Sequence, residues 1–474
     1  MRRPIAATIV GVTLAASACA PSEPDPRTET TTSAVIANRN LDLLFMIDSS
    51  SSMRLSQTNL TTNFPVFMDA LKNLPGGLPN VHVAVISSDM GAKDGIPGCT
   101  AIGDAGKFHF APTGTCTSTT LQNGATFISN VGGAANYTAA DISTVFSCIA
   151  ALGDQGCGFE RQFASVLRAL GADGMPAPAE NAGFLRSDAL LAIVMVTNED
   201  DCSARAGIDL YEFATNKLLS SELGPPTNYR CNEFGHLCDG VRPPRLAPGG
   251  DANVTVMLSN CSSAECDGSL IPAAEFAARI KALKTAPASE IMVAAITGPA
   301  TPYTVRWKTA PAADSGPWPE IMHSCTAPDG SFADPAVRIT DGVAAFGANG
   351  AVYPICDTNF GPSLQQLAAR IGTLLAAGGG TGGSAGRIPN CAMTGLGGQI
   401  TGEGGSGGAG GASGTGGSAV SDDAGIRAPP ITSSACGCRT GGADASGLGL
   451  GVALSAWLAV RRRRGRASAR PTRG

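Results

Sequence analysis

The stretch from Leu41 to Met53, which reads LDLLFMIDSSSSM, constrains this 474-residue chain more than any other. Its first seven residues are almost all apolar, as in a strand buried on both faces of a parallel sheet. The run ends in Asp48, and Ser50 and Ser52 follow at alternate positions. Carboxylate and hydroxyl oxygens suit a hard divalent cation, Mg²⁺ first and Ca²⁺ or Mn²⁺ next. The alternative is a serine-rich turn that only caps the next helix.

Apolar runs and helical patterns alternate from residue 41 to about residue 376. Further strands are predicted at Val81–Ser87, Leu190–Thr197 and Ile291–Thr297, with a weaker edge strand at Ala351–Cys356 and a short one at Lys107–Ala111. Helices are predicted at Leu60–Leu74, Phe159–Leu170, Leu210–Leu219, Ala273–Leu283 and Leu364–Leu375. This alternation predicts an α/β fold, a doubly wound and mostly parallel sheet flanked by helices.

A second polar turn, NEDD at residues 198–201, follows the strand predicted at Leu190–Thr197. In a doubly wound sheet, ligands bind outside the carboxyl ends of the strands, where both polar turns begin. The alternative is that the carboxylates of the second turn form a solvated loop or cap a helix. The metal site predicted from the two turns comprises Asp48, Ser50, Ser52, Asn198 and Asp200.

The pattern D-x-S-x-S after a buried strand resembles the metal-ion-dependent adhesion site of von Willebrand factor type A (VWA) domains. The resemblance implies that Ser50 and Ser52 bind the metal directly and that Asp48 acts largely through water. It also implies a Thr from a second loop and an Asp after a later strand.

Two positions depart from that pattern. Asn198 stands where the Asp is expected, so an uncharged amide replaces a carboxylate, and Asp200 or Asp201 would have to compensate. The loop at residues 154–158, DQGCG, contains no Thr, and the segment Ser87-Ser88-Asp89 is a possible substitute. The resemblance therefore leaves open whether the site binds metal or is vestigial.

The composition of the first 39 residues predicts that the protein is exported. Residues 1–18 combine Arg2 and Arg3, an apolar run and Ala-Ser-Ala, which together are typical of a signal peptide. Cys19 follows directly, so either plain cleavage or lipidation of Cys19 is possible, and residues 19–39 form a polar tether.

The last hundred residues change in composition. Residues 378–434 are rich in Gly and Ser and predict a flexible linker. Residues 435–474 contain Cys436 and Cys438, a short apolar run and an arginine cluster. This layout resembles the Myxo-CTERM sorting signals of myxobacterial surface proteins, which implies processing near the two cysteines. A plain C-terminal anchor is the alternative, although the apolar run is short for a membrane span.

Fifteen cysteines favour an oxidising compartment and disulfides, twelve of them within or near the predicted VWA-like domain at residues 40–377. Two cysteine-containing segments, 91–156 and 228–269, interrupt the strand–helix pattern and are predicted to be insertions without cores of their own, pinned by disulfides. The close neighbours predict the pairs Cys99–Cys116, Cys148–Cys157, Cys231–Cys238 and Cys261–Cys266, although sequence cannot fix connectivity. A zinc site at His236 and nearby cysteines is the alternative, but its spacing matches no standard zinc module.

The charge pattern argues against a nucleic-acid partner. The net charge is −5, yet nine of the 33 basic residues lie in the two end segments, so the domain itself is more acidic. No nucleophile elbow, phosphate-binding loop or dinucleotide fingerprint occurs in the chain.

These features predict an exported, non-enzymatic adhesion or binding protein that engages a protein or acidic ligand through a divalent metal. Its termini would attach it to the membrane or envelope, at the outer membrane and cell surface. Two alternatives remain, a structural surface scaffold with a vestigial metal site and an envelope hydrolase that uses the carboxylates at residues 199–201.

Overall fold

The computed structural model of the chain describes residues 39–92, 96, 98–111, 121–215, 217–266, 269–311 and 314–377. The predicted signal peptide, nearly all of the tether, the linker and the sorting segment lie outside these residues, as do Cys19, Cys436 and Cys438. Within the described part of the chain, no helix is long and apolar enough to span a bilayer.

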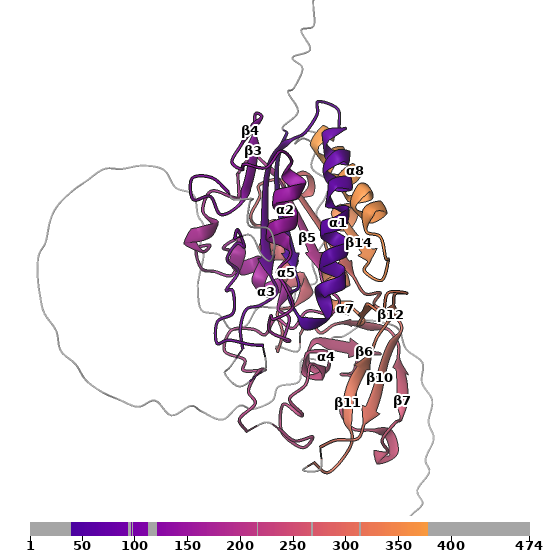
Figure 1. The fold of residues 1–474 in the computed structure, drawn as a ribbon. Coiled ribbons are helices and arrows are strands. Elements are labelled where there is room, and N and C mark those ends of the chain that lie inside the picture. Colours follow the sequence, from indigo (N-terminus) through magenta and orange to yellow (C-terminus); the bar gives the residue numbers. More distant parts are fainter. Residues whose placement is uncertain are drawn as a thin grey trace, which may run out of the picture. The chain divides into compact units, whose positions relative to one another are not determined.

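Seven strands form the central sheet, in the order β14-β9-β5-β1-β2-β3-β4 (Figure 1). The parallel strands are β1 (Asn40–Ile47), β2 (Asn80–Ser87), β5 (Leu190–Val196), β9 (Ile291–Thr297) and β14 (Gly350–Pro354). The hairpin of β3 (Ile128–Val131) and β4 (Ala134–Ala135) extends the β2 edge in antiparallel fashion. The predicted fold class is confirmed, and β14 lies at an edge, as its proline indicates.

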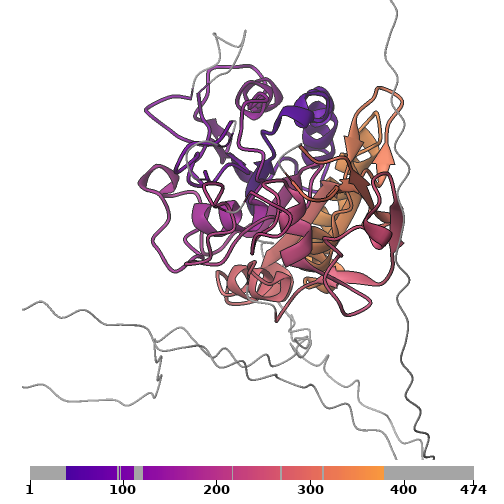
Figure 2. The same ribbon diagram turned by 90° about the horizontal axis from the view of Figure 1, so that it is seen from below.

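Alternate side chains of β1 enter two different hydrophobic cores, one on each face of the sheet. Leu43 and Phe45 pack into the core formed with α1 (Arg54–Lys72), α2 (Ile142–Ala150) and α8 (Gly361–Ala377). Leu44 and Met46 pack into the core formed with α3 (Gln162–Ala169), α5 (Ala273–Lys281) and α7 (Val337–Ala344). Figure 2 shows α1 and α5 on opposite sides of the sheet. Because both faces are covered, the strand has to be apolar at successive positions.

A smaller lobe contains the three-stranded sheet β11-β10-β7 and a separate two-stranded sheet, β6-β8 (Figure 1). Its elements are α4 (Tyr229–Gly235), β6 (His236–Cys238), β7 (Thr255–Leu258), β8 (Cys261–Ser263), β10 (Tyr303–Lys308) and β11 (Trp318–Met322). Buried Tyr303, Val305 and Trp307 form its core with Tyr229. Segment 228–269 packs against β10, which lies outside it and supplies Tyr303, Val305 and Trp307 to this core.

The segment at residues 91–156 is likewise part of the main domain. It contributes α2 and the β3–β4 hairpin, and the ring of Phe146 stacks on that of Phe64 with centroids 3.5 Å apart. The expectation of an insertion without periodic structure was therefore wrong for its second half.

The remaining short elements connect these layers. They are α6 (Pro287–Glu290), β12 (Cys325–Thr326), β13 (Phe332–Ala333) and the single 3₁₀ turns at Ser51–Met53, Ala179–Asn181, Pro248–Gly250 and Gly347–Asn349.

Disulfides are present, but the predicted pairs were wrong. The described bridges are Cys99–Cys157, Cys202–Cys231, Cys238–Cys261 and Cys325–Cys356. They exclude the predicted Cys99–Cys116, Cys148–Cys157, Cys231–Cys238 and Cys261–Cys266. The observed bridges join segments 23 to 58 residues apart, because the fold, and not proximity along the chain, brings the sulfurs together. Such bridges are typical of proteins in oxidising compartments outside the cytoplasm.

Two predicted elements are absent. The described residues of the segment 210–219 form turns and irregular structure and no helix. The buried Arg230 guanidinium donates to the carbonyl oxygens of Leu210 and Glu212, which a helix would have used internally. Residues 107–111 lie beside β2 through a bond from His109 N to Val85 O, 2.8 Å, without forming a strand.

Candidate metal centre at the strand ends

The two polar turns meet at one edge of the sheet, as predicted. β1 and β5 are adjacent and parallel, with Ile47 opposite Val196. The backbone N–H of Asp48 donates to the carbonyl of Val196 at 2.9 Å, so the pairing continues into the turns. The carboxyl ends of both strands therefore present their polar residues to the same space.

Ser50, Ser52 and Asn198 form a connected set of side-chain oxygens. The hydroxyls of Ser50 and Ser52 lie 3.2 Å apart, and the Ser52 hydroxyl donates to Asn198 Oδ1 at 3.1 Å. Ser50 and Asn198 are buried and Ser52 is half-buried. Asn198 Nδ2 donates to the carbonyl of Phe332, which leaves its Oδ1 directed toward the serines. Residues from both turns are thus joined at their functional atoms.

Asp48 is fully buried beside these residues, and among the described residues its oxygens accept hydrogen bonds from neutral groups. Oδ1 accepts from the backbone N–H of Ser50 at 2.7 Å and from the hydroxyl of Ser88 at 3.3 Å. Oδ2 accepts from the hydroxyl of Thr197 at 2.7 Å. Burial raises the pKa of Asp48 above its usual value, and these hydrogen bonds oppose the rise. Ser88, proposed from sequence as a substitute for the missing Thr, does lie at this site.

The Asp200 carboxylate accepts hydrogen bonds from the first residues of α7 and from His236 of the smaller lobe. Its Oδ2 accepts from His236 Nε2 at 2.7 Å and from the backbone N–H of Arg338 at 2.9 Å, and its Oδ1 accepts from the N–H of Ile339 at 3.0 Å. Burial opposes ionisation, yet the bonds from His236 and the charge of Arg338 bring the pKa of Asp200 below its usual value. These donors already bond to both oxygens of Asp200. Its role as a metal ligand stays a prediction.

Asp201 forms a buried ion pair. Its Oδ2 lies 2.9 Å from Arg338 Nη2, both side chains have no exposed surface, and Oδ1 accepts from the N–H of Phe163. This carboxylate is compensated within the fold and holds the start of α3.

Two glutamates that are not among the predicted metal ligands, Glu160 and Glu199, lie near Asp48. Burial, and then the charge of Glu199, raise the pKa of Glu160 well above its usual value. Burial, followed by the charges of Asp334 and Asp48, raises the pKa of Glu199 to about 8. A hydrogen bond joins the carboxyl groups of Glu160 and Glu199. The signal that could have revealed Glu160 was its position two residues after the loop at 154–158, in which the resemblance expects a Thr.

Asp334 is another missed residue. Its backbone N–H donates to the carbonyl of Asn198 at 2.8 Å, and its carboxylate lies 2.7 Å from His323 Nδ1. Burial raises the pKa of Asp334, although His323 opposes the rise. The Cys325–Cys356 bridge ties this part of the chain to the end of β14. No local sequence pattern predicts the contact between Asp334 and Asn198.

The donor set fits a hard cation. Carboxylate, hydroxyl and amide oxygens from Asp48, Ser50, Ser52 and Asn198 converge, and Glu160 Oε1 is buried without a hydrogen-bond partner among the described residues. In the described ranges no group of three or more His, Cys, Asp or Glu residues is arranged to hold a metal, so any site here depends on hydroxyl and amide oxygens too.

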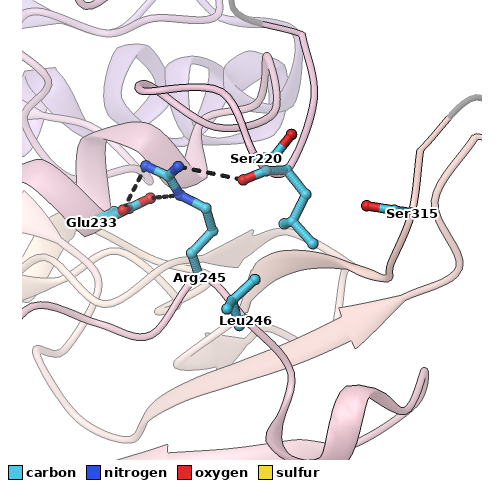
Figure 3. A pocket seen from close by; sticks show the side chains of 6 residues that line it. Ser220, Glu233, Arg245, Leu246 and Ser315 are labelled. Carbon is cyan, nitrogen blue, oxygen red and sulfur yellow. Dashed lines mark hydrogen bonds and ion pairs between the residues drawn. The ribbon is translucent and has the colours of Figure 1, made fainter.

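The smaller lobe contains a pocket of about 500 Å³ (Figure 3). Arg245 forms a two-bond ion pair with Glu233 there, at 2.7 and 2.8 Å, and also donates to the carbonyl of Leu219. The charges of Arg245 and Glu233 therefore compensate each other within the pocket.

Comparisons with known proteins give distant matches only. No family model matches the chain, and no curated protein matches it. Solved structures similar to it include a von Willebrand factor type A protein from Catenulispora acidiphila, at 10% identity, covering 70% of this chain and 42% of that one, with a TM-score of 0.26. Two structures of the pilus adhesin SpaC from Lactobacillus rhamnosus GG, one in an open conformation, match at 12% and 11% identity.

The two adhesin matches cover 70% and 72% of this chain and 30% and 31% of the adhesin, with TM-scores of 0.29. The chain thus matches less than half the length of each of these proteins. The fold assignment rests on the strand order and the two helical layers.

Proposed function

We propose that this chain is an exported, non-enzymatic surface protein that binds a partner through a divalent cation held at the ends of β1 and β5. The cation is Mg²⁺, with Ca²⁺ or Mn²⁺ as substitutes. Ser50 and Ser52 hold it directly, and Asp48 and Asn198 complete the set of protein oxygens, Asp48 through water. When bound, the cation supplies positive charge and an open coordination position for an acidic group of the partner.

The observation that carries this proposal is the chain of contacts from Ser50 through Ser52 to Asn198, at 3.2 and 3.1 Å. Residues separated by about 150 positions are brought together by adjacent parallel strands. A turn that only caps a helix would not require contacts with residues at the end of β5. In addition, neither Ser50 nor Met53 caps the first helical turn through its side chain.

Attachment to the cell surface is part of the same proposal. The disulfides support a location outside the cytoplasm. The sequence of residues 1–19 supports export, and that of residues 435–474 supports sorting to the outer membrane surface.

Calorimetric titration of the mature protein with Mg²⁺, Ca²⁺ and Mn²⁺ tests the metal site. Binding tighter than about millimolar is expected. The double variant Ser50→Ala/Ser52→Ala should lose it, whereas Ser51→Ala, an exposed residue in the same turn, should retain it. If the parent protein binds none of the three cations, the metal-dependent function is wrong and the fold is untouched.

The partner chemistry is tested on sensor surfaces that carry either carboxylate or hydroxyl groups. Mg²⁺-dependent retention on the carboxylate surface alone is expected. Equal retention on both surfaces, or retention that persists in chelator, would contradict capture of acidic groups by the cation.

A structural scaffold with a vestigial site is the second candidate. Its support is the uncharged Asn198 and the lack, in the described part of the chain, of a cluster of three acidic or histidine ligands. The same titration separates the two candidates, because a vestigial site predicts no saturable cation binding.

A further inference from the structure

A third loop, which ends at Glu160, lies at the carboxyl ends of the strands. It makes backbone hydrogen bonds at or next to both polar turns. The N–H of Gly156 donates to the carbonyl of Ser49 at 2.8 Å, and the carbonyl of Glu160 accepts from the N–H of Cys202 at 2.9 Å. A Cβ at residue 156 would lie 2.8 Å from the Ser49 carbonyl oxygen, so only glycine permits this approach. The loop ending at Glu160 is therefore placed between the two turns.

The Glu160 side chain is buried, with 2% of the residue exposed, and its Oε1 has no hydrogen-bond partner among the described residues. Gln162, at the start of α3, also has a buried oxygen without a hydrogen-bond partner in the described part of the chain, its Oε1. Its Nε2 donates to the Thr197 hydroxyl at 3.0 Å. Buried acceptors of this kind are rare, and each requires an explanation.

The charge around Glu160 has one sign. Its carboxyl faces those of Glu199 and Asp48, which are the charged groups acting most strongly on it. Asp201, two residues beyond Glu199, is by contrast paired with Arg338 at 2.9 Å. A buried carboxylate without a compensating group is costly, and a bound cation would supply that compensation at Glu160.

We propose that Glu160 is a direct ligand of the divalent cation through Oε1, and that it restores the negative charge that Asn198 does not provide. This inference rests on the proposed function and adds to it a ligand from the third loop. Glu160 follows the loop at residues 154–158, in which the VWA resemblance expects a neutral Thr, and a carboxylate ligand raises the affinity for a dication, because affinity follows ligand charge.

Titration of the mature protein with Mg²⁺, Ca²⁺ and Mn²⁺ is repeated on Glu160→Gln, which keeps the side-chain shape and removes the charge. The affinity should fall about tenfold or more. Asp154→Asn removes the same charge earlier in the loop, from a half-buried side chain, and should stay within about twofold of the parent. Thermal unfolding in chelator should show that Glu160→Gln is folded and no less stable than the parent.

Europium luminescence provides a readout independent of affinity. Lifetimes of bound Eu³⁺ in H₂O and D₂O count the waters on the ion, and Glu160→Gln should gain about one water as a protein ligand is lost. A residue that only supports the loop would leave this count unchanged.

The outcomes separate the two proposals. If Ser50→Ala/Ser52→Ala abolishes cation binding while Glu160→Gln leaves the affinity and the water count unchanged, Glu160 is no ligand and the proposed function stands. If the parent binds no cation, both proposals are overturned. A tenfold loss with one added water supports Glu160 as the ligand.

Discussion

Asp42 and Asp48 belong to the two ends of one strand, and neither has exposed surface. At the amino end of β1, Asp42 Oδ1 accepts from Arg186 Nε at 2.8 Å and Oδ2 accepts from the backbone N–H of Arg186 at 2.7 Å. At the carboxyl end, Asp48 accepts hydrogen bonds from uncharged groups, which include the hydroxyls of Ser88 and Thr197 and the backbone N–H of Ser50. Burial raises the pKa of both carboxyls, but at Asp42 it is chiefly Arg186 that opposes the rise.

The difference separates a buried acid that is paired with an arginine from one that accepts hydrogen bonds from uncharged groups. The fold provides its own cation at the amino end of the sheet, and it surrounds Asp48 with Glu160 and Glu199 instead. The 198–201 turn repeats the contrast within neighbouring residues, since Asp201 is paired with Arg338 and Glu199 faces other carboxylates.

The largest expected effect is at the amino end. Arg186→Met leaves the Asp42 carboxylate buried without its partner, so the free energy of unfolding should fall by about 3–5 kcal/mol. Urea unfolding measures the loss. The double variant Asp42→Asn/Arg186→Met removes both charges and should recover part of it, and no recovery would show that Arg186 acts through its bonds to the Leu41 and Asn80 carbonyls.

A smaller effect is expected at the carboxyl end. In chelator, Asp48→Asn should change the free energy of unfolding by about 1 kcal/mol or less, because no ion pair is broken and an amide oxygen can still accept a hydrogen bond. Urea unfolding in EDTA measures this change. In saturating Mg²⁺ the variant should lose whatever stabilisation the cation gives the parent. A loss in EDTA as large as that of Arg186→Met would remove the distinction between the two ends.

The smallest effect is a dependence on pH at the amino end. Burial lowers the pKa of His82 below 6.5, with Arg186 adding to the fall and the bond to the Phe184 carbonyl and the charge of Asp42 opposing it. As pH falls below 6.5, the unfolded chain takes up this proton first, so stability present above that pH is lost.

The slope from this group can reach at most about 1.4 kcal/mol per pH unit. His82→Asn keeps a donor for the Phe184 carbonyl at 2.9 Å and should flatten the curve between pH 7.5 and 5.5. Urea unfolding at several pH values in EDTA measures both curves, and parallel curves would assign the pH dependence to other groups.

The sequence predicted the strands of the central sheet wherever burial on both faces of the sheet produced a continuous apolar run. β1, β2, β5 and β9 were predicted almost to the residue, because strands covered by helices need apolar side chains at every position. Residues 210–219 carried a helical pattern too, yet Arg230, from another element, takes their carbonyls. The cores of the smaller lobe and the disulfide pairs likewise depend on partners distant along the chain.

The sequence by itself determined which oxygens stand at the end of the first strand, since Asp48, Ser50 and Ser52 are local and their backbone direction follows from one buried strand. Only the tertiary structure decided that Asn198 touches Ser52, that Asp200 is taken by His236 and the start of α7, and that Glu160 lies buried beside Asp48. The physical reason is that a buried charge is governed by its surroundings in space, and those surroundings come from strands and loops that are distant along the chain.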